Sequence, residues 1–388
     1  MPEVTIIADD LTGAADCGIA FTLAGIETFV ATGGKPAPSA RVLAVDTDSR
    51  ALPAAEAARR TAAAAGAASV LYKKIDSTLR GNAGSEIAAI AKGAFVVAAP
   101  AFPAAGRTTI DGEVLVQGVR LGDTEIWRSS GMRGPSTLAE MLRAEGLRTA
   151  VVRLGQIRAS AESALGTAAE AASAAVCDAE TDDDLALIAQ AAARLHRRVV
   201  WAGSSGLARQ LPKALALRPG GAPQLPPRRK GPVLTLVGSR AGASRAQADA
   251  LASSPRMFSL VIKPEALLAR NQPGDELERA LGDGRDCLVA IDVARELDLG
   301  KALELARALG EFAAPHAVRC SGLIATGGDT ARALLAALDL SGIALLGEIE
   351  AGVPFGLAGS LLLVTKAGGF GTRETLLRAS AALHRMTD

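Results

Sequence analysis

The sequence has few aromatic residues and no excess of charge of either sign. Aromatic side chains make up 3% of its 388 residues, and 42 basic residues are balanced by 41 acidic ones for a net charge of +1. Proteins that bind single-stranded nucleic acid stack bases on aromatic rings, and polyanion-binding proteins carry a basic excess or stripe. We therefore expect no nucleic-acid partner, although a local basic pocket for a phosphate or carboxylate remains possible.

Cysteine and histidine are also scarce. The cysteines are Cys17, Cys177, Cys287 and Cys320, with no Cys-x-x-Cys pair, and the histidines are His196, His316 and His384. Neither set has the spacing of a zinc site or a redox pair. We interpret all of them as core or surface residues.

Long apolar runs are missing as well. The longest candidate, 351–365, is interrupted by Pro354 and three glycines, and no uncharged run reaches the roughly 18 residues that a membrane span needs. The N-terminal residues contain no apolar core of a signal peptide. These absences predict a cytoplasmic, reduced protein without a membrane partner.

The length of the chain predicts two domains. The segment 218–232 contains five prolines and three glycines, and this composition cannot continue a helix or a central strand. We interpret it as a linker between an N-terminal domain, 1–220, and a C-terminal domain, 231–388. A long surface loop within one domain is the alternative.

Short β-rich runs alternate with alanine-rich helical stretches on both sides of this segment. Strands are expected at 4–8, 42–45, 70–72 and 95–98, and again at 233–237, 287–291, 323–325 and 361–364. Such alternation is typical of βαβ units. We therefore predict the α/β class, with two α/β domains that have mainly parallel sheets. Residues 110–135 break the rhythm and are expected to form an inserted hairpin or loop.

Polar residues follow each strand expected in the first half. The clusters are Asp9-Asp10, Asp46–Arg50, Lys73–Asn82 and Pro100–Arg107. The carboxyl ends of parallel strands share one edge of a sheet, so these clusters should meet. Arginine and lysine bind carboxylates, and Asp and Ser bind hydroxyls, which together suit a polyhydroxy acid. Helix capping is the alternative for any single cluster.

Glycine-rich turns follow the strands expected in the second half. They are Gly238-Ser239-Arg240, Gly327–Thr330 and Gly368–Gly371. Glycines let backbone N–H groups approach phosphates at helix N-termini, so three such turns favour nucleotide binding. The sequence contains no G-x-x-x-x-G-K-[ST] and no G-x-G-x-x-G, which excludes a P-loop ATPase and disfavours a nicotinamide dehydrogenase. A sugar-acid domain beside a nucleotide domain predicts phosphoryl transfer in an interdomain cleft.

Four motifs in the same order resemble the four-carbon acid sugar kinase family, which includes D-threonate, D-erythronate and 3-oxo-tetronate kinases. They are Ala8–Ala14, Lys73–Asn82, Gly327–Thr330 and Thr365–Gly371. The resemblance extends over nearly the whole chain. It implies ATP-dependent phosphorylation of the terminal C4 hydroxyl of a sugar acid, with ATP and Mg²⁺ as cofactors. A homodimer is a further expectation.

The resemblance also implies site residues. The substrate should lie against Asp10, Ser49, Arg50, Lys74, Asp76, Ser77 and Arg80. The polar clusters after the strands add Asp9 and Arg107 to this set. ATP should lie against Ser239, Gly327, Gly328, Asp329, Thr330, Gly368 and Gly369. Asp10, Asp76 and Arg80 are the predicted catalytic residues. The base should be a carboxylate near the C4 hydroxyl, which leaves Asp10, Asp76 and then Asp9 as candidates.

Two alternatives to a kinase stay open at this point. A dehydrogenase or aldolase acting on the same acids is disfavoured by the missing dinucleotide motif and histidine cluster. A non-catalytic sugar-acid sensor would keep the polar clusters of the first half but would not need three glycine turns in the second half. Within the kinase interpretation, the sequence does not select among D-threonate, D-erythronate and 3-oxo-tetronate, and it identifies no metal ligand.

Overall fold

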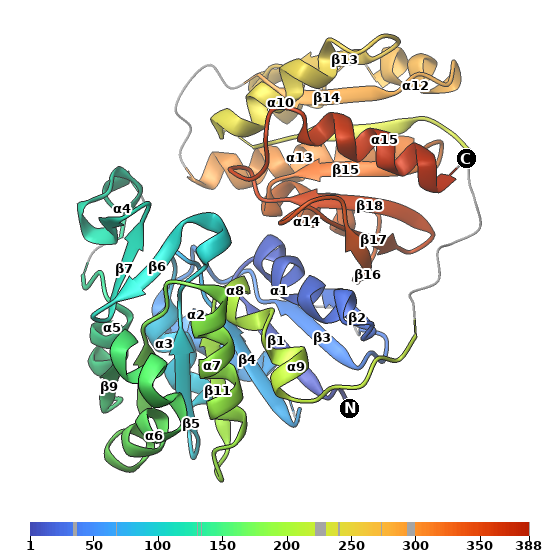
Figure 1. Ribbon diagram of the computed structural model, residues 1–388. Coiled ribbons are helices and arrows are strands. Elements are labelled where there is room, and N and C mark those ends of the chain that lie inside the picture. Colours follow the sequence, from blue (N-terminus) through green and yellow to red (C-terminus); the bar gives the residue numbers. More distant parts are fainter. Residues whose placement is uncertain are drawn as a thin grey trace. The chain divides into compact units, whose positions relative to one another are not determined.

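The computed structural model describes residues 1–33, 37–66, 68–129, 131–132, 134–221, 230–239, 241–272, 274–292 and 299–387. The chain divides into two compact units, one of Met1–Gly33 and Pro38–Ala222, the other of Gly34–Ala37 and Pro223–Asp388. Each unit combines helices with a mainly parallel sheet (Figure 1), which confirms the predicted fold class. The predicted linker, 218–232, lies in part outside the described residues, and a site between the domains stays a prediction.

The N-terminal unit is built on a parallel sheet. In spatial order its strands are β2 (Thr28–Ala31), β3 (Val42–Asp46), β1 (Val4–Ala8), β4 (Val70–Lys74), β11 (Val199–Gly203), β5 (Phe95–Ala99), β10 (Ala174–Cys177) and β9 (Thr149–Val152). Strands β1, β5 and β10 are buried along their whole length. Continuous apolar runs of this kind are typical of parallel strands covered on both faces.

The order of these strands reverses beside β1. The chain leaves β1 toward β3 and β2 on one side and then continues at β4 on the other side. Ligands of open α/β sheets bind at such a switch point, beyond the carboxyl ends of the strands. In this unit the switch point brings together the segments that follow β1 and β4.

Helices cover this sheet, and a small second sheet is inserted after β5. The helices are α1 (Leu11–Leu23), α2 (Ala54–Ala64), α3 (Ala83–Ile90), α4 (Glu125–Ser129), α5 (Leu138–Ala144), α6 (Leu154–Ala171), α7 (Asp182–Ala193), α8 (Ser205–Ala208) and α9 (Leu211–Ala214), with 3-10 turns at Pro103–Ala105 and Leu121–Asp123. The insertion is the antiparallel sheet of β6 (Arg107–Ile110), β7 (Glu113–Val116) and β8 (Val119–Arg120). The hairpin expected after residue 110 is therefore present.

The C-terminal unit repeats the same logic. Its strands, in spatial order, are β13 (Phe258–Ile262), β14 (Cys287–Ile291), β12 (Val233–Val237), β15 (Gly322–Thr326), β18 (Leu361–Lys366), β17 (Pro354–Ala358) and β16 (Gly342–Glu348), of which β17 is antiparallel to both neighbours. The helices are α10 (Gly242–Ala252), α11 (Pro264–Leu268), α12 (Gly274–Gly282), α13 (Leu299–Ala317), α14 (Gly328–Ala337) and α15 (Thr375–Thr387). Here the strand order reverses between β12 and β15, so the turns after these two strands mark the equivalent position.

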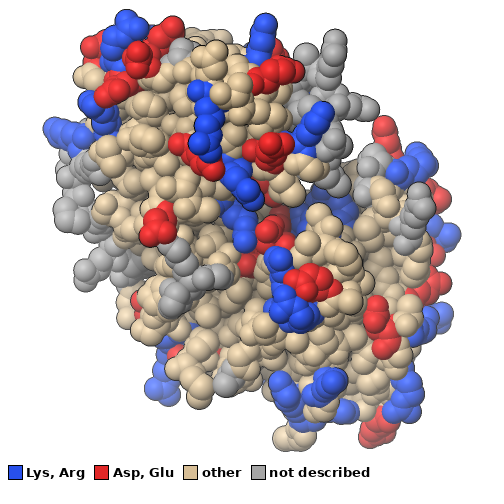
Figure 2. All heavy atoms as spheres, turned by 180° about the vertical axis from the view of Figure 1, so that it is seen from behind, with Lys and Arg blue, Asp and Glu red and all other residues tan. Residues whose placement is uncertain are grey.

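The surface agrees with the balanced composition. On the face drawn in Figure 2, basic and acidic side chains are interspersed rather than gathered into one field of a single sign. Among the described residues, no helix combines the length and apolar composition that a membrane crossing requires.

Candidate functional site

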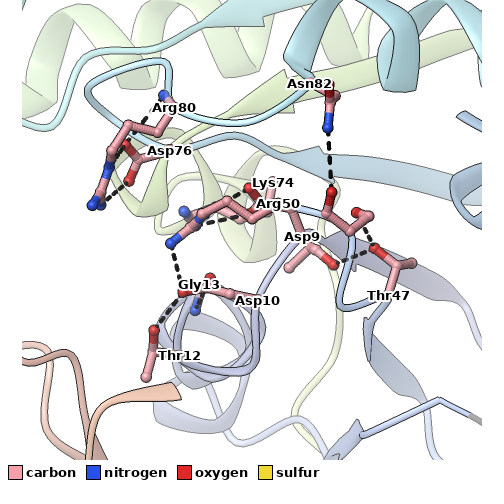
Figure 3. Close-up of polar contacts among 12 residues, drawn as sticks. Asp9, Asp10, Thr12, Gly13, Thr47, Arg50, Lys74, Asp76, Arg80 and Asn82 are labelled. Atoms are coloured by element: carbon pink, nitrogen blue, oxygen red, sulfur yellow. Dashed lines mark hydrogen bonds and ion pairs between the residues drawn. The ribbon is translucent and has the colours of Figure 1, made fainter. Parts of the chain in front are cut away.

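Arg50 lies between two aspartates at the carboxyl end of β1. Its Nε and Nη2 donate to Asp9 at 2.8 and 2.9 Å, and its Nη1 donates to Asp10 Oδ2 at 2.9 Å (Figure 3). The bidentate pair with Asp9 is nearly buried, because the aspartate side chain is 3% exposed. Asp10 is more accessible, at 22%. The structure thus brings three of the predicted residues into one cluster.

Asp10 also begins helix α1. Its Oδ1 accepts from the Gly13 amide at 2.9 Å, and its Oδ2 accepts from Thr12 Oγ1 at 2.8 Å. Aspartate is a favoured N-cap residue because its side chain satisfies a free helical N–H group. Capping, which the sequence left as an alternative to ligand binding, is therefore real for Asp10. It also fixes the direction of the carboxylate.

The loop after β4 holds a second ion pair. Arg80 Nε and Nη2 donate to Asp76 at 2.8 and 3.0 Å, while Thr78 Oγ1 donates to the same carboxylate at 2.5 Å. Leu79 is fully buried in this loop with a φ of 54°, a conformation that costs free energy for a residue with a side chain. The loop is thus held in a defined and strained shape.

Positive charge at this rim keeps the carboxylates ionised. Burial opposes ionisation of Asp9, but the charge and hydrogen bonds of Arg50 outweigh it and lower the pKa of Asp9. Burial is likewise outweighed at Asp76, where the hydrogen bond from Arg80 and the charge of Arg50 lower the pKa well below its usual range. A carboxylate with so low a pKa is a weak proton acceptor.

Lys73 and Lys74 are consecutive residues of β4, so their side chains point to opposite faces of the sheet. Lys74 is 6% exposed. Burial alone would lower the pKa of Lys74, but the neighbouring Cys17, Asp10, Asp76 and Asp9 together outweigh burial and raise this pKa. Lys74 Nζ lies 3.1 Å from the position that a Cβ would take at Gly13. This lysine therefore belongs to the cluster around Asp10.

Lys73 instead forms a buried ion pair on the opposite face of the sheet from Lys74. It is fully buried, its Nζ lies 3.0 Å from Glu86 Oε2 of α3, and it donates to the Ile7 carbonyl at 3.2 Å. Ser49 Oγ donates to Glu86 Oε1 at 2.5 Å and is 2.7 Å from Thr47 Oγ1. The predicted site residue Ser49 is thus fully buried, and its hydroxyl faces this network rather than the rim.

Two residues hold the loop after β4 against the loop after β3. Asn82 Nδ2 donates to the carbonyls of Ser49 and Leu52 at 3.2 and 2.9 Å. Gly81 has a φ of 88°, and a Cβ there would lie 2.8 Å from Asp9 Oδ2. Any larger residue would be strained and would press on the Asp9–Arg50 pair.

Arg107 reaches the same region from the inserted sheet. Burial, together with the charge of Arg80, lowers the pKa of Arg107 against the opposite effect of Asp76. Within the described residues its Nε is buried without a hydrogen-bond partner. Two neighbouring guanidinium groups that are not fully neutralised are suited to an anion. Ser77, half-buried in the loop after β4, completes the predicted set.

The glycine turns of the C-terminal unit also converge. A Cβ at Gly238 would overlap Thr330 Oγ1, and a Cβ at Gly368 would overlap Ser239 Oγ. The turns after β12, β15 and β18 are therefore in contact. Among the described residues, helices α10 and α14 both begin there without a side-chain cap hydrogen bond, and helix N-termini of this kind favour an anion. Arg240 lies outside the described residues.

Sequence reasoning missed three parts of these sites. Strand β11 lies between β4 and β5 and ends in the Ser204-Ser205 turn. This turn was missed because β11 itself was not recognised as a strand. Glu86 was not singled out, because an acidic residue in the first turn of a helix is common. Lys366, at the end of β18, was quoted within a motif but assigned no role. Two buried lysines in one strand, which must each find a partner, were the available signal for Glu86.

The described residues contain no group of three or more His, Cys, Asp or Glu side chains that could hold a metal ion.

The chain matches known proteins over its whole length. Residues 4–211 match the family model described as a sugar-binding N-terminal domain, and residues 234–376 match a nucleotide-binding C-terminal domain. It is 43% identical to a D-threonate kinase of Cupriavidus necator, covering 97% of each chain. It is 30% identical to a D-erythronate kinase of Heliobacterium modesticaldum, covering 96% of this chain and 95% of that one.

A solved structure from Salmonella typhimurium, described as a putative tRNA synthase, superposes with a TM-score of 0.81 at 20% identity and covers 99% of both chains. This likeness concerns the fold alone. The full-length identity to named sugar-acid kinases and the two family models carry the assignment. The chain belongs to the four-carbon acid sugar kinase family.

Proposed function

We propose that this protein transfers the γ-phosphoryl group of ATP to the terminal C4 hydroxyl of a four-carbon sugar acid, and that D-threonate is its preferred substrate. The observation that carries the proposal is the cluster of Arg50, Asp10, Lys74, Asp76 and Arg80 at the switch point of a sugar-binding type of domain. The 43% identity to a D-threonate kinase supports the choice of acid.

Arg80 and Arg107 bind the carboxylate of the substrate in this proposal. Arg80 uses Nε and Nη2 for Asp76, which leaves Nη1 for a ligand. Arg107 offers its unpartnered Nε. An anion between the two guanidinium groups would relieve their mutual repulsion. The positive charges of Arg80 and Arg107 therefore favour binding of the substrate carboxylate.

Asp10 is the proposed general base. Asp76 accepts hydrogen bonds from Thr78 and Arg80 on both oxygens and has a strongly lowered pKa. Asp9 is buried and engaged twice by Arg50. Asp10 is the most exposed of the three, and its carboxylate is fixed by the helix it caps. It can therefore accept the C4 hydroxyl proton as the bond to phosphorus forms. Asp9 supports this geometry through its pair with Arg50, and Ser49 supports it through its buried hydrogen bond to Glu86.

ATP is placed at the glycine turns of the C-terminal domain. Its phosphates lie against Ser239, Gly327, Gly328, Asp329, Thr330, Gly368 and Gly369 in this proposal. Backbone N–H groups and two helix N-termini supply the contacts. A Mg²⁺ ion bound with the nucleotide would supply charge neutralisation.

Arg80→Ala is expected to raise the KM for the sugar acid about tenfold or more, because a hydrogen bond to a charged group contributes roughly 1.5–3 kcal/mol. The dissociation constant for ATP should stay the same. Steady-state kinetics and calorimetric titration measure the two effects separately. Arg59→Ala, which removes an exposed arginine of α2 whose partner among the described residues is Glu56, is the matched control. An Arg80 variant that keeps the wild-type kcat/KM would show that Arg80 does not contact the substrate.

The function itself is tested by coupled ADP release with ATP and Mg²⁺. We expect D-threonate to give the highest kcat/KM among D-threonate, D-erythronate and 3-oxo-tetronates. A preference for D-erythronate or a 3-oxo-tetronate would keep the reaction and change the substrate. Background rates with every one of these acids would contradict the proposal. A homodimer, expected from the sequence, stays a prediction.

A further inference from the structure

Lys366 is the last residue of β18, and it touches all three elements of the phosphate region. Its carbonyl accepts from the Gly327 amide at 2.8 Å. Its Nζ lies 3.3 Å from Ser244 Oγ of α10 and 3.4 Å from the Gly368 carbonyl. Ser244 Oγ donates to the same carbonyl at 2.8 Å. The turn after β15, the turn after β18 and helix α10 are therefore all linked to one residue.

This lysine is buried, and within the described part of the chain no carboxylate pairs with it at close range. It is 1% exposed, whereas lysine is almost never fully buried unless it is paired. Beside it, at the end of β15, Thr326 is also fully buried, and its hydroxyl has no hydrogen-bond partner among the described residues. A buried cation and an unpartnered hydroxyl side by side indicate a place where an acceptor is missing.

The turn that Lys366 supports has free donors. With the Gly368 carbonyl held by Ser244 and Lys366, the amides of Gly368 and Gly369 have no acceptor within the described part of the chain. Gly368 also packs so closely on Ser239 that a Cβ would overlap it. The carbonyl side of the turn thus faces Lys366, and its N–H groups remain for a ligand.

We propose that Lys366 is the positioning residue of the nucleotide site, which fixes the Gly368–Gly369 turn through its ammonium group and adds a buried positive charge beneath the phosphates. The inference rests on the proposed function, because it takes the glycine turns to be the ATP site. It extends that function by naming the Lys366 ammonium group as a positive charge for the phosphates, since the glycines of the turns carry no charged side chain.

The charged groups around Lys366 permit a pH test. Helices α10, α14 and α15, which pack on strands β12, β15 and β18, carry Arg245, Asp249, Asp329, Arg332 and Arg378, and Glu350 follows β16. Burial lowers the pKa of Lys366 to about 8, against the smaller opposite effect of Glu350. Glu350 itself accepts from Arg378 at 2.7 Å. A bound phosphate would raise the pKa of Lys366 again, so nucleotide binding should take up a proton near pH 8.

The experiment is calorimetric titration with a non-hydrolysable ATP analogue and Mg²⁺ between pH 7.5 and 9.5. Wild-type affinity should fall above about pH 8, by up to about tenfold per pH unit. Lys366→Met should bind the analogue about 10- to 100-fold more weakly at pH 7.5 and should lose the pH dependence. Lys366→Gln, which can still donate to the Gly368 carbonyl without a charge, should also lose the pH dependence. Lys263→Met, at an exposed lysine of the same domain, should behave like wild type.

Folding is controlled separately. Because the pKa of Lys366 is lowered from its ordinary value to about 8 in the folded protein, protonation of this lysine destabilises the fold increasingly as the pH falls through that window, and the penalty is complete below about pH 8. Removing the lysine should therefore not lower the melting temperature at pH 7. If wild type binds the analogue and Lys366→Met binds it equally well, or keeps the wild-type pH slope, the inference is wrong. If wild type itself binds no nucleotide, the proposed function fails as well.

Discussion

Asp10→Asn is expected to lower kcat by about a hundredfold to ten-thousandfold, which is the usual contribution of a positioned general base. Asparagine keeps the size of the side chain and can still accept from the Gly13 amide, so helix α1 should keep its cap. Arg50 would keep its bidentate pair with Asp9. What the variant loses is the proton acceptor nearest to solvent in this cluster. Rapid-quench kinetics at saturating ATP and sugar acid would measure the effect on the chemical step.

Two companion variants make this result specific. Asp76→Asn should act mainly on the KM for the sugar acid, because Asp76 positions Arg80 and has too low a pKa to be an effective base. Asp183→Asn changes an exposed aspartate in the first turn of α7 and should leave both constants alone. If Asp10→Asn retains more than about a tenth of the wild-type kcat while Asp76→Asn does not, the base is Asp76 and the present assignment is reversed.

Glu86→Leu is expected to destabilise the N-terminal domain by about 3–5 kcal/mol, because it leaves the fully buried Lys73 ammonium without its counter-ion. Lys73→Met should have an effect of the same order for the converse reason. The double variant Lys73→Met/Glu86→Leu should be more stable than either single one, since replacing both charges by apolar side chains removes the unpaired charge altogether.

The measurement is urea unfolding followed by tryptophan fluorescence. The chain has two tryptophans, Trp127 and Trp201, and both lie in the N-terminal unit. Trp201 is 2% exposed on β11, directly beside β4, so the signal reports on the domain that carries the mutations. Additive destabilisation in the double variant would show that Lys73 and Glu86 are not coupled, and the buried pair would then have no structural role.

The strands with the clearest patterns were predictable from the sequence. Short apolar runs such as Val4–Ala8 and Val233–Val237 end in polar or glycine-rich turns, and these boundaries agree with β1 and β12. Strands β9, β10 and β11 were missed, because their short apolar runs lie in an alanine-rich background where helix and strand patterns are hard to separate. Strands β16 and β17 were missed for a different reason, since both contain glycine and β17 also begins with Pro354.

The meeting of these polar side chains at one edge of the sheet could also be predicted, but their pairing could not. Parallel strands place their carboxyl ends on one edge, so Asp10, Arg50 and Asp76 were expected to meet. Which side chain pairs with which depends on the order β3-β1-β4. That order puts Arg50 across from both Asp9 and Asp10, and it leaves Asp76 to Arg80 of its own loop. The order is set by the packing of the whole sheet, and no local pattern encodes it.

The glycine turns of the C-terminal domain have a consequence for how the two sites can change over evolutionary time. The acid site depends on particular side chains, so it can drift only through compensating substitutions among Arg50, Asp9 and Asp10. The turns at Gly238 and Gly368 instead depend on the absence of a side chain, since a single methyl group at either one would overlap a neighbour. A substitution of either glycine would therefore be resisted by packing alone, before any effect on a ligand. Substrate preference can therefore diverge within this family while the nucleotide site keeps its glycine pattern, and that pattern is the more durable mark of ancestry.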